Sequence, residues 1–201
     1  MTQQALDVQT RLFLLRHGEV EWTRVVGGEP PLSAAGIATA ELAAATLPRF
    51  DCIAASPQRP ARETAETIGL VRGITQWWQE DLEEIRTVMP LADAGAYAAW
   101  LDRLFESYDT SADGESLADG AARMAAALRR IGDRFHGRTT LVVSHPVILL
   151  AFRANQSATP LSRDQVQAMP DLALATLDYL EGRFYVVQDF PIRWTAHQVD
   201  G

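Results

Sequence analysis

Residues 12–18, Leu-Phe-Leu-Leu-Arg-His-Gly, constrain the fold more than any other part of this chain. Four consecutive large apolar residues are typical of a strand buried on both faces, as the central strands of parallel sheets are. The run ends abruptly at Arg16 and His17. A cation and an imidazole belong at the carboxyl end of such a strand, where open α/β sheets bind their ligands. The stretch therefore predicts an α/β fold with a ligand site at this strand end. The alternative is a chance tripeptide whose side chains are solvated.

The composition is typical of one globular domain. Of the 201 residues, 47% are apolar and 22% are charged, so we expect a single domain over 1–201, with a flexible N-terminus over 1–10. The net charge of −8 argues against binding to nucleic acid or to an anionic membrane. Because the N-terminus has no apolar signal core and no stretch has the length of a membrane span, we expect a cytoplasmic protein.

All 18 basic residues are arginines. Without lysine, Schiff-base chemistry and a phosphate-loop lysine are excluded, so any phosphate clamp must use guanidinium groups. The single cysteine, Cys52, cannot form an internal disulfide and is expected in the core. The chain lacks His-x-His, His-Glu-x-x-His and cysteine clusters, so we expect no metal site, and it lacks the Gly-x-Ser-x-Gly motif of serine hydrolases.

Strand and helix patterns alternate along the chain. Buried-type strands are expected at 12–15, 51–55, 74–78 and 139–144. Helices are expected at about 34–46, 60–68, 116–136, 146–154 and 162–169. A β-hairpin of 173–180 and 183–188 is expected to close the chain.

Residues 86–113 are less regular, and within them apolar residues recur at helical spacing at Tyr97, Trp100, Leu101, Leu104 and Phe105. This stripe predicts a helix that faces the core, with a lid over the site as the alternative. The aromatic residues of 77–105 are expected to line either a hydrophobic substrate pocket or the face of a homodimer.

Two of the predicted strands end in a histidine, His17 after 12–15 and His145 after 139–144. If these strands are parallel neighbours, the two imidazoles face each other across a cleft, and Ser56 at the end of the second strand, 51–55, lies on the same rim. A neutral imidazole can act as a nucleophile in phosphoryl transfer, and Arg16 and the second histidine can bind the phosphoryl oxygens. A carboxylic acid must protonate the leaving group, and Glu83 or Glu84 could do so unless both belong to a solvated helix start.

Taken in order, the motifs of the chain resemble the histidine phosphatase superfamily, with its phosphoglycerate mutase-like fold. The matching segments extend over almost the whole chain and are Arg16-His17-Gly18-Glu19, Glu21-Trp22, Pro31-Leu32-Ser33-x-x-Gly36, Ser56-Pro57 with Ala61, Thr64 and Ala65, Leu82-x-Glu84-Ile85, Gly114-Glu115-Ser116 with Arg123, and Val143-Ser144-His145. The resemblance implies a three-layer α/β/α sandwich with a mostly parallel central sheet. It also implies that the site needs no metal and no organic cofactor.

The resemblance further implies a role for each matching residue. His17 would be the phosphorylated nucleophile, and Arg16 and His145 would bind the phosphoryl group from opposite sides. Glu84, rather than Glu83, would be the proton donor. Glu83 remains a candidate for contact with the substrate.

The sequence departs from the family pattern at several places. Pro60 stands where the family has a second phosphate-binding arginine, so Arg59 or, failing that, Arg62 would have to supply the clamp. A missing charged clamp would cost on the order of 2–4 kcal/mol in the transition state. Thr23, a candidate substrate contact, replaces a common asparagine, and Pro146 replaces a common glycine.

The leading hypothesis is a phosphomonoesterase that hydrolyses a small or medium organic phosphate through a phosphohistidine. The first alternative is a phosphotransferase of the phosphoglycerate mutase type, which needs additional basic residues to hold the carboxylate of its substrate. The second, motivated by Pro60, is a weakly active or non-catalytic relative that binds phosphorylated ligands.

Overall fold

The computed structural model describes residues 9–74, 77–79, 81–88, 91–106 and 114–194. Six strands form one sheet in the order β3-β2-β4-β1-β5-β6. The strands are β1 (Thr10–Arg16), β2 (Cys52–Ala55), β3 (Trp77–Gln79), β4 (Thr139–Ser144), β5 (Leu174–Leu180) and β6 (Arg183–Gln188). The first four are parallel to one another, and β5 and β6 form an antiparallel hairpin added beside β1.

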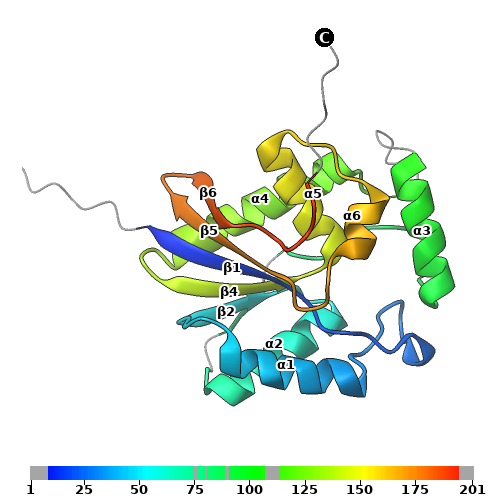
Figure 1. The fold of residues 1–201 in the computed structure, drawn as a ribbon, viewed down its shortest axis with the longest axis horizontal. Coiled ribbons are helices and arrows are strands. Elements are labelled where there is room, and N and C mark those ends of the chain that lie inside the picture. The colour runs from blue at the N-terminus through cyan, green and yellow to red at the C-terminus, as the bar shows by residue number, and fades with distance from the viewer. Residues whose placement is uncertain (1–8, 75–76, 80, 89–90, 107–113, 195–201) are drawn as a thin grey trace, which may run out of the picture.

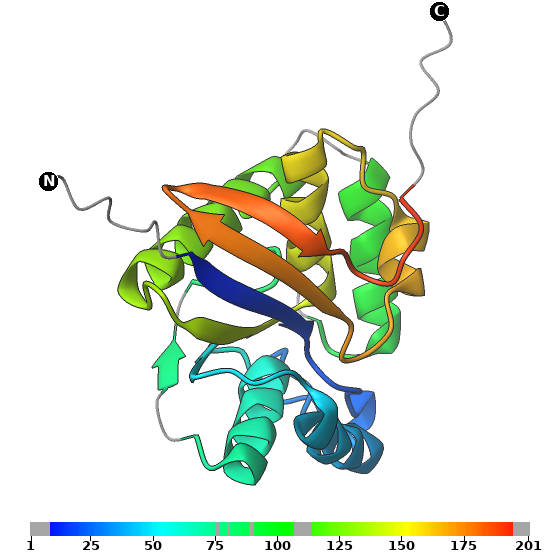
Figure 2. The same ribbon diagram turned by 60° about the vertical axis from the view of Figure 1, so that its left-hand side comes forward.

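Helices cover both faces of this sheet, as Figures 1 and 2 show. They are α1 (Ala34–Thr46), α2 (Arg59–Arg72), α3 (Ala94–Glu106), α4 (Leu117–Arg134), α5 (Pro146–Ser157) and α6 (Arg163–Ala168), with a 3-10 turn η1 (Trp22–Arg24). One face carries α1 and α2; the other carries α4 and α5, and α6 and α3 extend that layer to one side (Figure 1). The predicted three-layer α/β/α arrangement with a mostly parallel sheet is confirmed.

The apolar run of β1 supplies both halves of the core. Because side chains alternate along a strand, Leu12 and Leu14 pack with the helices of one layer and Phe13 and Leu15 with α1 and α2. All of these side chains are buried. The expectation of a strand buried on both faces is therefore confirmed.

Local signals predict most helices correctly. The hydroxyl of Ser33 accepts the amide proton of Gly36 and caps α1, and Ser116 caps α4 in the same way through Asp119. The second helix is longer than predicted, because it continues to Arg72 and ends only at Gly73, whose φ of 67° is readily adopted by glycine. The third strand begins at Trp77 rather than at 74; residues 75–76 lie outside the described part.

Two expectations about less regular segments have mixed outcomes. The apolar stripe of 97–105 does form a helix, α3, with Trp100 and Leu101 buried. A flexible N-terminus over 1–10 is wrong at its last residue: Thr10 begins β1, is fully buried and donates its hydroxyl to Gly132 O at 3.0 Å. Residues 1–8 lie outside the described part. Among the described helices, none has both the length and the apolarity that crossing a membrane requires.

Candidate active site

The parallel pairing of β1 with β4 brings the two strand-end histidines together. Arg16 is paired with Ser144 in the register, and the amide of His17 donates to Ser144 O at 2.9 Å. The next residues on both strands are His17 and His145. Their ring centroids are 5.2 Å apart and the rings are inclined by 61°. The predicted facing of the two imidazoles is therefore present in the structure.

His17 is held through one ring nitrogen, and its other ring nitrogen has no hydrogen-bond partner among the residues that the structure describes. Its Nδ1 lies 2.8 Å from Gly18 O, and because a carbonyl oxygen only accepts, Nδ1 carries the proton of the neutral ring. The lone pair is then on Nε2. Burial, and next the charge of Arg16, lower the pKa of His17 to about 4, so the ring is neutral at pH 7 and Nε2 can act as a nucleophile.

His145 is neutral for a related reason. Its Nε2 lies 2.9 Å from the hydroxyl of Ser56 at the end of β2. Burial lowers the pKa of His145 well below the ordinary value, and the neighbouring His17 lowers it further. At neutral pH the site therefore contains two uncharged imidazoles, and its positive charge comes from Arg16.

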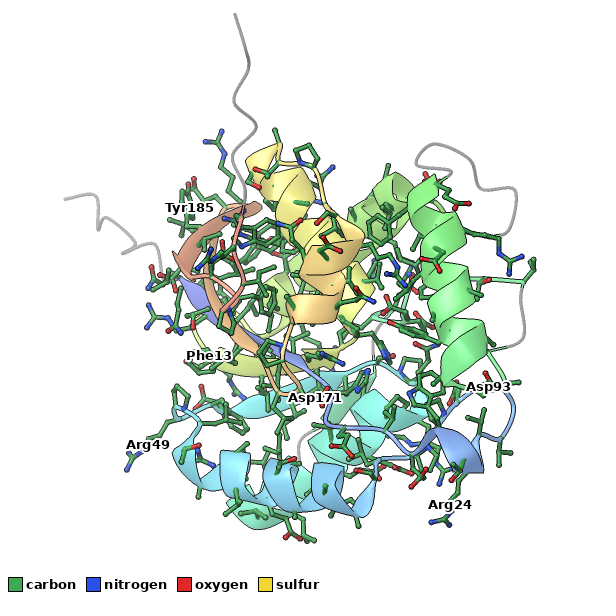
Figure 3. The ribbon with its side chains drawn as sticks, turned by 45° about the vertical axis from the view of Figure 1, so that its right-hand side comes forward. Phe13, Arg24, Arg49, Asp93, Asp171 and Tyr185 are labelled. Atoms are coloured by element: carbon green, nitrogen blue, oxygen red, sulfur yellow. The ribbon has the colours of Figure 1, made fainter. Side chains whose placement is uncertain are left out.

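Arg16 lines a cavity and is anchored by the segment before β5. It donates to Met169 O and forms an ion pair with Asp171 at 2.8 Å. Asp171, which is labelled in Figure 3, lies in the loop before β5. Its Nε is buried and has no hydrogen-bond partner among the described residues. A buried donor without a partner is costly, and Arg16 lines the same cavity as His17, so its guanidinium is the cationic group available there to an anionic ligand.

The carboxylate of Glu84 sits at the N-terminus of α5. Its Oε1 accepts the amide protons of Ile85 and Ile148 at 2.9 and 2.8 Å, and its Oε2 accepts that of Val147 at 3.0 Å. Burial raises the pKa of Glu84 to about 7, although these three hydrogen bonds oppose the shift. Near neutral pH this group exchanges a proton easily, as an acid–base catalyst must.

The backbone around Glu84 is fixed by two other side chains. Its amide donates to Gln58 Oε1 at 2.8 Å. Arg123 donates to the carbonyl oxygens of Glu83 and Glu84 at 3.0 and 3.1 Å, and it forms two hydrogen bonds with the carboxylate of Glu115. Arg123 thus positions the loop that presents Glu84.

These groups face one cavity of about 150 Å³. It is lined by Arg16, His17, Val20, Trp22, Gly28, Glu29, Pro30, Gln58, Pro60, Glu84, Leu91, Tyr97, His145 and Pro146. The phosphoryl-transfer residues expected from the sequence (Arg16, His17, Glu84 and His145) all lie in this wall.

Four other predicted site residues do not line the cavity. Arg59 donates its Nε to Glu63 at 2.7 Å, and Arg62 lies near Glu66 at 3.8 Å on the exposed side of α2. Thr23 donates to Glu21 at the surface. Glu83 lies near Arg86 and Arg123, at 3.7 and 3.5 Å. In this arrangement neither Arg59 nor Arg62 supplies the clamp that is missing at Pro60, because each is turned toward a carboxylate of α2.

Sequence reasoning does not single out Gln58 or Asp171 as residues of the site. Gln58 is two residues after Ser56, and its position on a strand-end loop is the signal that could have identified it. The apolar stripe assigns Tyr97 of α3 to the core, but this residue lines the cavity, as the alternative of a pocket lined by the aromatic residues of 77–105 expects. Asp171 shows no recognisable motif, and only the fold brings it to Arg16.

The chain belongs to the histidine phosphatase superfamily (branch 1), whose family model matches residues 12–189. Among curated proteins it is similar to an acid phosphatase of Mycobacterium tuberculosis, with 29% identity over 86% of this chain and 88% of that protein.

Two solved structures have the same fold. Bacillus stearothermophilus YhfR has 27% identity and a TM-score of 0.73, over 90% of this chain and 96% of the other. A phosphoserine phosphatase mutant from Entamoeba histolytica, in complex with phosphoserine, has 20% identity and a TM-score of 0.71 over the same shares.

Proposed function

We propose that this protein is a phosphomonoesterase that works through a phosphohistidine at His17. The observation that carries the proposal is the pairing of His17, whose Nδ1 is held by Gly18 O, with His145 in a cavity that Arg16 and Glu84 also line. The family, and a relative that is called an acid phosphatase, support a phosphatase.

In the first step, Nε2 of His17 attacks the phosphorus of the ester and the bond to the leaving oxygen breaks. That oxygen takes the proton of the Glu84 carboxyl group and departs as an alcohol. In the second step, a water molecule loses a proton to the Glu84 carboxylate and attacks phosphorus. The phosphorus–nitrogen bond breaks, and inorganic phosphate and the neutral imidazole are released. Glu84 ends with its proton, ready for the next cycle.

The equatorial oxygens of the phosphoryl group need donors during both steps. Arg16 supplies charge, and its unpartnered Nε faces no competing acceptor among the described residues. The side-chain amide of Gln58, which lines the cavity, supplies a neutral donor. Its Oε1 accepts from the backbone amide of Glu84, and its NH₂ group is the part that can donate to the phosphoryl group. We propose that Gln58 partly compensates for Pro60, which contributes no donor.

One observation favours the alternative of a weakly active or non-catalytic protein that binds phosphorylated ligands. Pro60 lines the cavity, and Arg59 is turned to Glu63. A phosphate-binding relative with slow turnover would have such a site. We place it second because the nucleophile and the proton donor are both present.

The test is hydrolysis of 4-nitrophenyl phosphate by the wild type and by His17→Ala, in the presence of a chelator. We expect metal-independent turnover that the substitution abolishes, and an acid-labile phosphate trapped on the wild type alone. Folded wild-type protein that binds phosphate but forms no phosphoenzyme would favour the binding protein.

A further inference from the structure

The cavity has a polar part, which contains the histidines, and a mostly apolar part. Beyond Arg16, the histidines and Glu84, the lining is mostly apolar: Val20, Trp22, Pro30, Pro60, Leu91, Tyr97 and Pro146. The ring of Tyr97 lies 5.3 Å from that of Trp22 and 5.3 Å from that of Trp100, which is buried. An aromatic wall anchored in the core in this way presents a fixed apolar surface to the leaving group of a substrate.

The cavity also has little positive charge. Arg16 is the one arginine among its lining residues, and it is already paired with Asp171. The chain has no lysine, and all of its arginines lie in the described segments. Arg59 is next to Pro60 in the sequence and Arg86 is close to Glu84. Arg59 forms an ion pair with Glu63, and Arg86 forms one with Asp81. Arg24 points outward from η1 (Figure 3).

The cavity wall contains a second carboxylate besides that of Glu84. Glu29 lines the cavity, and its Oε2 accepts the amide proton of Arg59 at 2.9 Å, which holds the side chain in place. A substrate that carries a carboxylate besides its phosphate would bring this charge into an apolar wall that contains Glu29. Burying an unpaired charge beside a like charge is unfavourable.

We infer that the protein selects phosphate monoesters whose leaving group is aromatic or apolar and has no second anionic group. This inference rests on the proposed phosphatase function and adds the substrate class to it. Trp22 and Tyr97 contact the leaving group, and Glu29 excludes carboxylated esters. Phosphorylated hydroxy acids and amino acids fall outside this class.

The experiment compares 4-carbamoylphenyl phosphate with 4-carboxyphenyl phosphate, two esters of the same shape that differ in one charge. We expect kcat/KM to be at least tenfold higher for the neutral ester. Glu29→Gln, whose side-chain oxygen can still accept from Arg59, should reduce this ratio at least threefold. Glu41→Gln makes the same change in net charge on the exposed side of α1 and should leave the ratio as in the wild type.

The aromatic wall is tested separately with Trp22→Ala. This substitution should lower kcat/KM for phenyl phosphate about fivefold more than for ethyl phosphate, because one aromatic contact is lost. An equal loss for both esters would overturn the role of Trp22.

A binding measurement separates failure of this inference from failure of the proposed function. Calorimetry with benzylphosphonate and 4-carboxybenzylphosphonate reports the charge preference without turnover. Equal hydrolysis of both aryl esters, or tighter binding of the carboxylated phosphonate, would overturn the inference and leave the phosphatase standing. Preferential binding of benzylphosphonate with no phosphoenzyme and no hydrolysis would support the selectivity and overturn the phosphatase.

Discussion

Glu84 accepts the amide proton of Ile148 at 2.8 Å through Oε1, and this hydrogen bond joins the loop after β3 to the first turn of α5. The same carboxylate also accepts from Val147. Helix N-termini leave their first amides without partners and attract negative charge. Glu84 therefore has two tasks: it caps a buried helix and, in the proposed mechanism, it moves the proton of the reaction.

The double task of Glu84 predicts two separable losses in Glu84→Gln. The amide keeps one acceptor oxygen but points an NH₂ group at a backbone donor, so we expect the free energy of unfolding to fall by about 1–2 kcal/mol. Turnover of an alkyl phosphate should fall by about 10²–10⁴-fold, and that of 4-nitrophenyl phosphate much less, because its leaving group needs no proton. Urea denaturation and steady-state kinetics measure the two effects. A larger kinetic loss in Glu83→Gln would assign the proton to Glu83 instead.

The two shifted pKa values predict a defined pH range of activity. His17 must be neutral, so kcat/KM for an alkyl phosphate should rise as the pH increases through the His17 pKa of about 4. Glu84 must be protonated in the first step, so the rate should fall as the pH increases through the Glu84 pKa of about 7. With 4-nitrophenyl phosphate the fall at higher pH should be shallower. If both substrates show the same fall, the upper limb belongs to another group.

The same two groups predict opposite effects of pH on stability. The raised pKa of Glu84 means that its contribution is complete below its ordinary value of 4.5 and is lost as the pH rises through about 7. The lowered pKa of His17 means that its contribution is complete above 6.5 and is lost as the pH falls through about 4. Replacing His17 by Phe should therefore make the protein less sensitive to acid in that range, as urea denaturation at several pH values would show. An unchanged acid dependence would contradict the buried neutral ring.

Pro60 predicts a gain of function. An arginine there would add a charged donor to the cavity wall, and its own amide would need no partner in the first turn of α2. We expect Pro60→Arg to raise kcat/KM for 4-nitrophenyl phosphate by up to about a hundredfold. Pro60→Ala is the control for loss of the ring and should give no such gain. Arg59→Gln should change kcat/KM less than about threefold, and a large loss there would show that Arg59 leaves Glu63 to bind phosphate.

The contacts of Arg123 predict a strong effect on stability. Its side chain is buried, and it holds three backbone carbonyls and the carboxylate of Glu115. Arg123→Met leaves that carboxylate without its partner, so the free energy of unfolding should drop by about 3–5 kcal/mol. The paired change Arg123→Met with Glu115→Leu should recover part of the loss. Arg62→Met, which removes an exposed charge on α2, should cost less than about 1 kcal/mol.

The sequence is most informative where one local pattern decides the outcome. The apolar run of 12–15 identifies a central strand because both faces of such a strand are buried. The sequence predicts that the histidines after this strand and after β4 face each other if the two strands are parallel neighbours, because such strands end at one edge; that they are neighbours is seen only in the structure. Only the family pattern favours Glu84 over Glu83; in the structure the carboxylate of Glu84 lines the cavity and that of Glu83 does not.

The remaining features depend on contacts between distant segments. Asp171 comes to Arg16 only because β5 is added beside β1. Arg59 could turn either toward the cavity or toward Glu63 on its own helix. The spacing of residues in the sequence does not decide between these two orientations. Tyr97 belongs to an apolar stripe, and a stripe does not reveal which member reaches past the core into a pocket.

The place of β1 in the sheet has a consequence for how the protein loses activity. The amides of Arg16 and His17 donate across both neighbours of this strand, to Ala173 O at 3.0 Å and to Ser144 O at 2.9 Å. Backbone bonds at the centre of a sheet exchange their hydrogens only when the whole domain opens. His17, the proposed nucleophile, therefore directly follows a central strand whose backbone hydrogen bonds we expect to persist until global unfolding. On heating, the enzyme should keep its full rate until the cooperative transition and then lose it together with the fold, without an earlier phase in which the site melts alone.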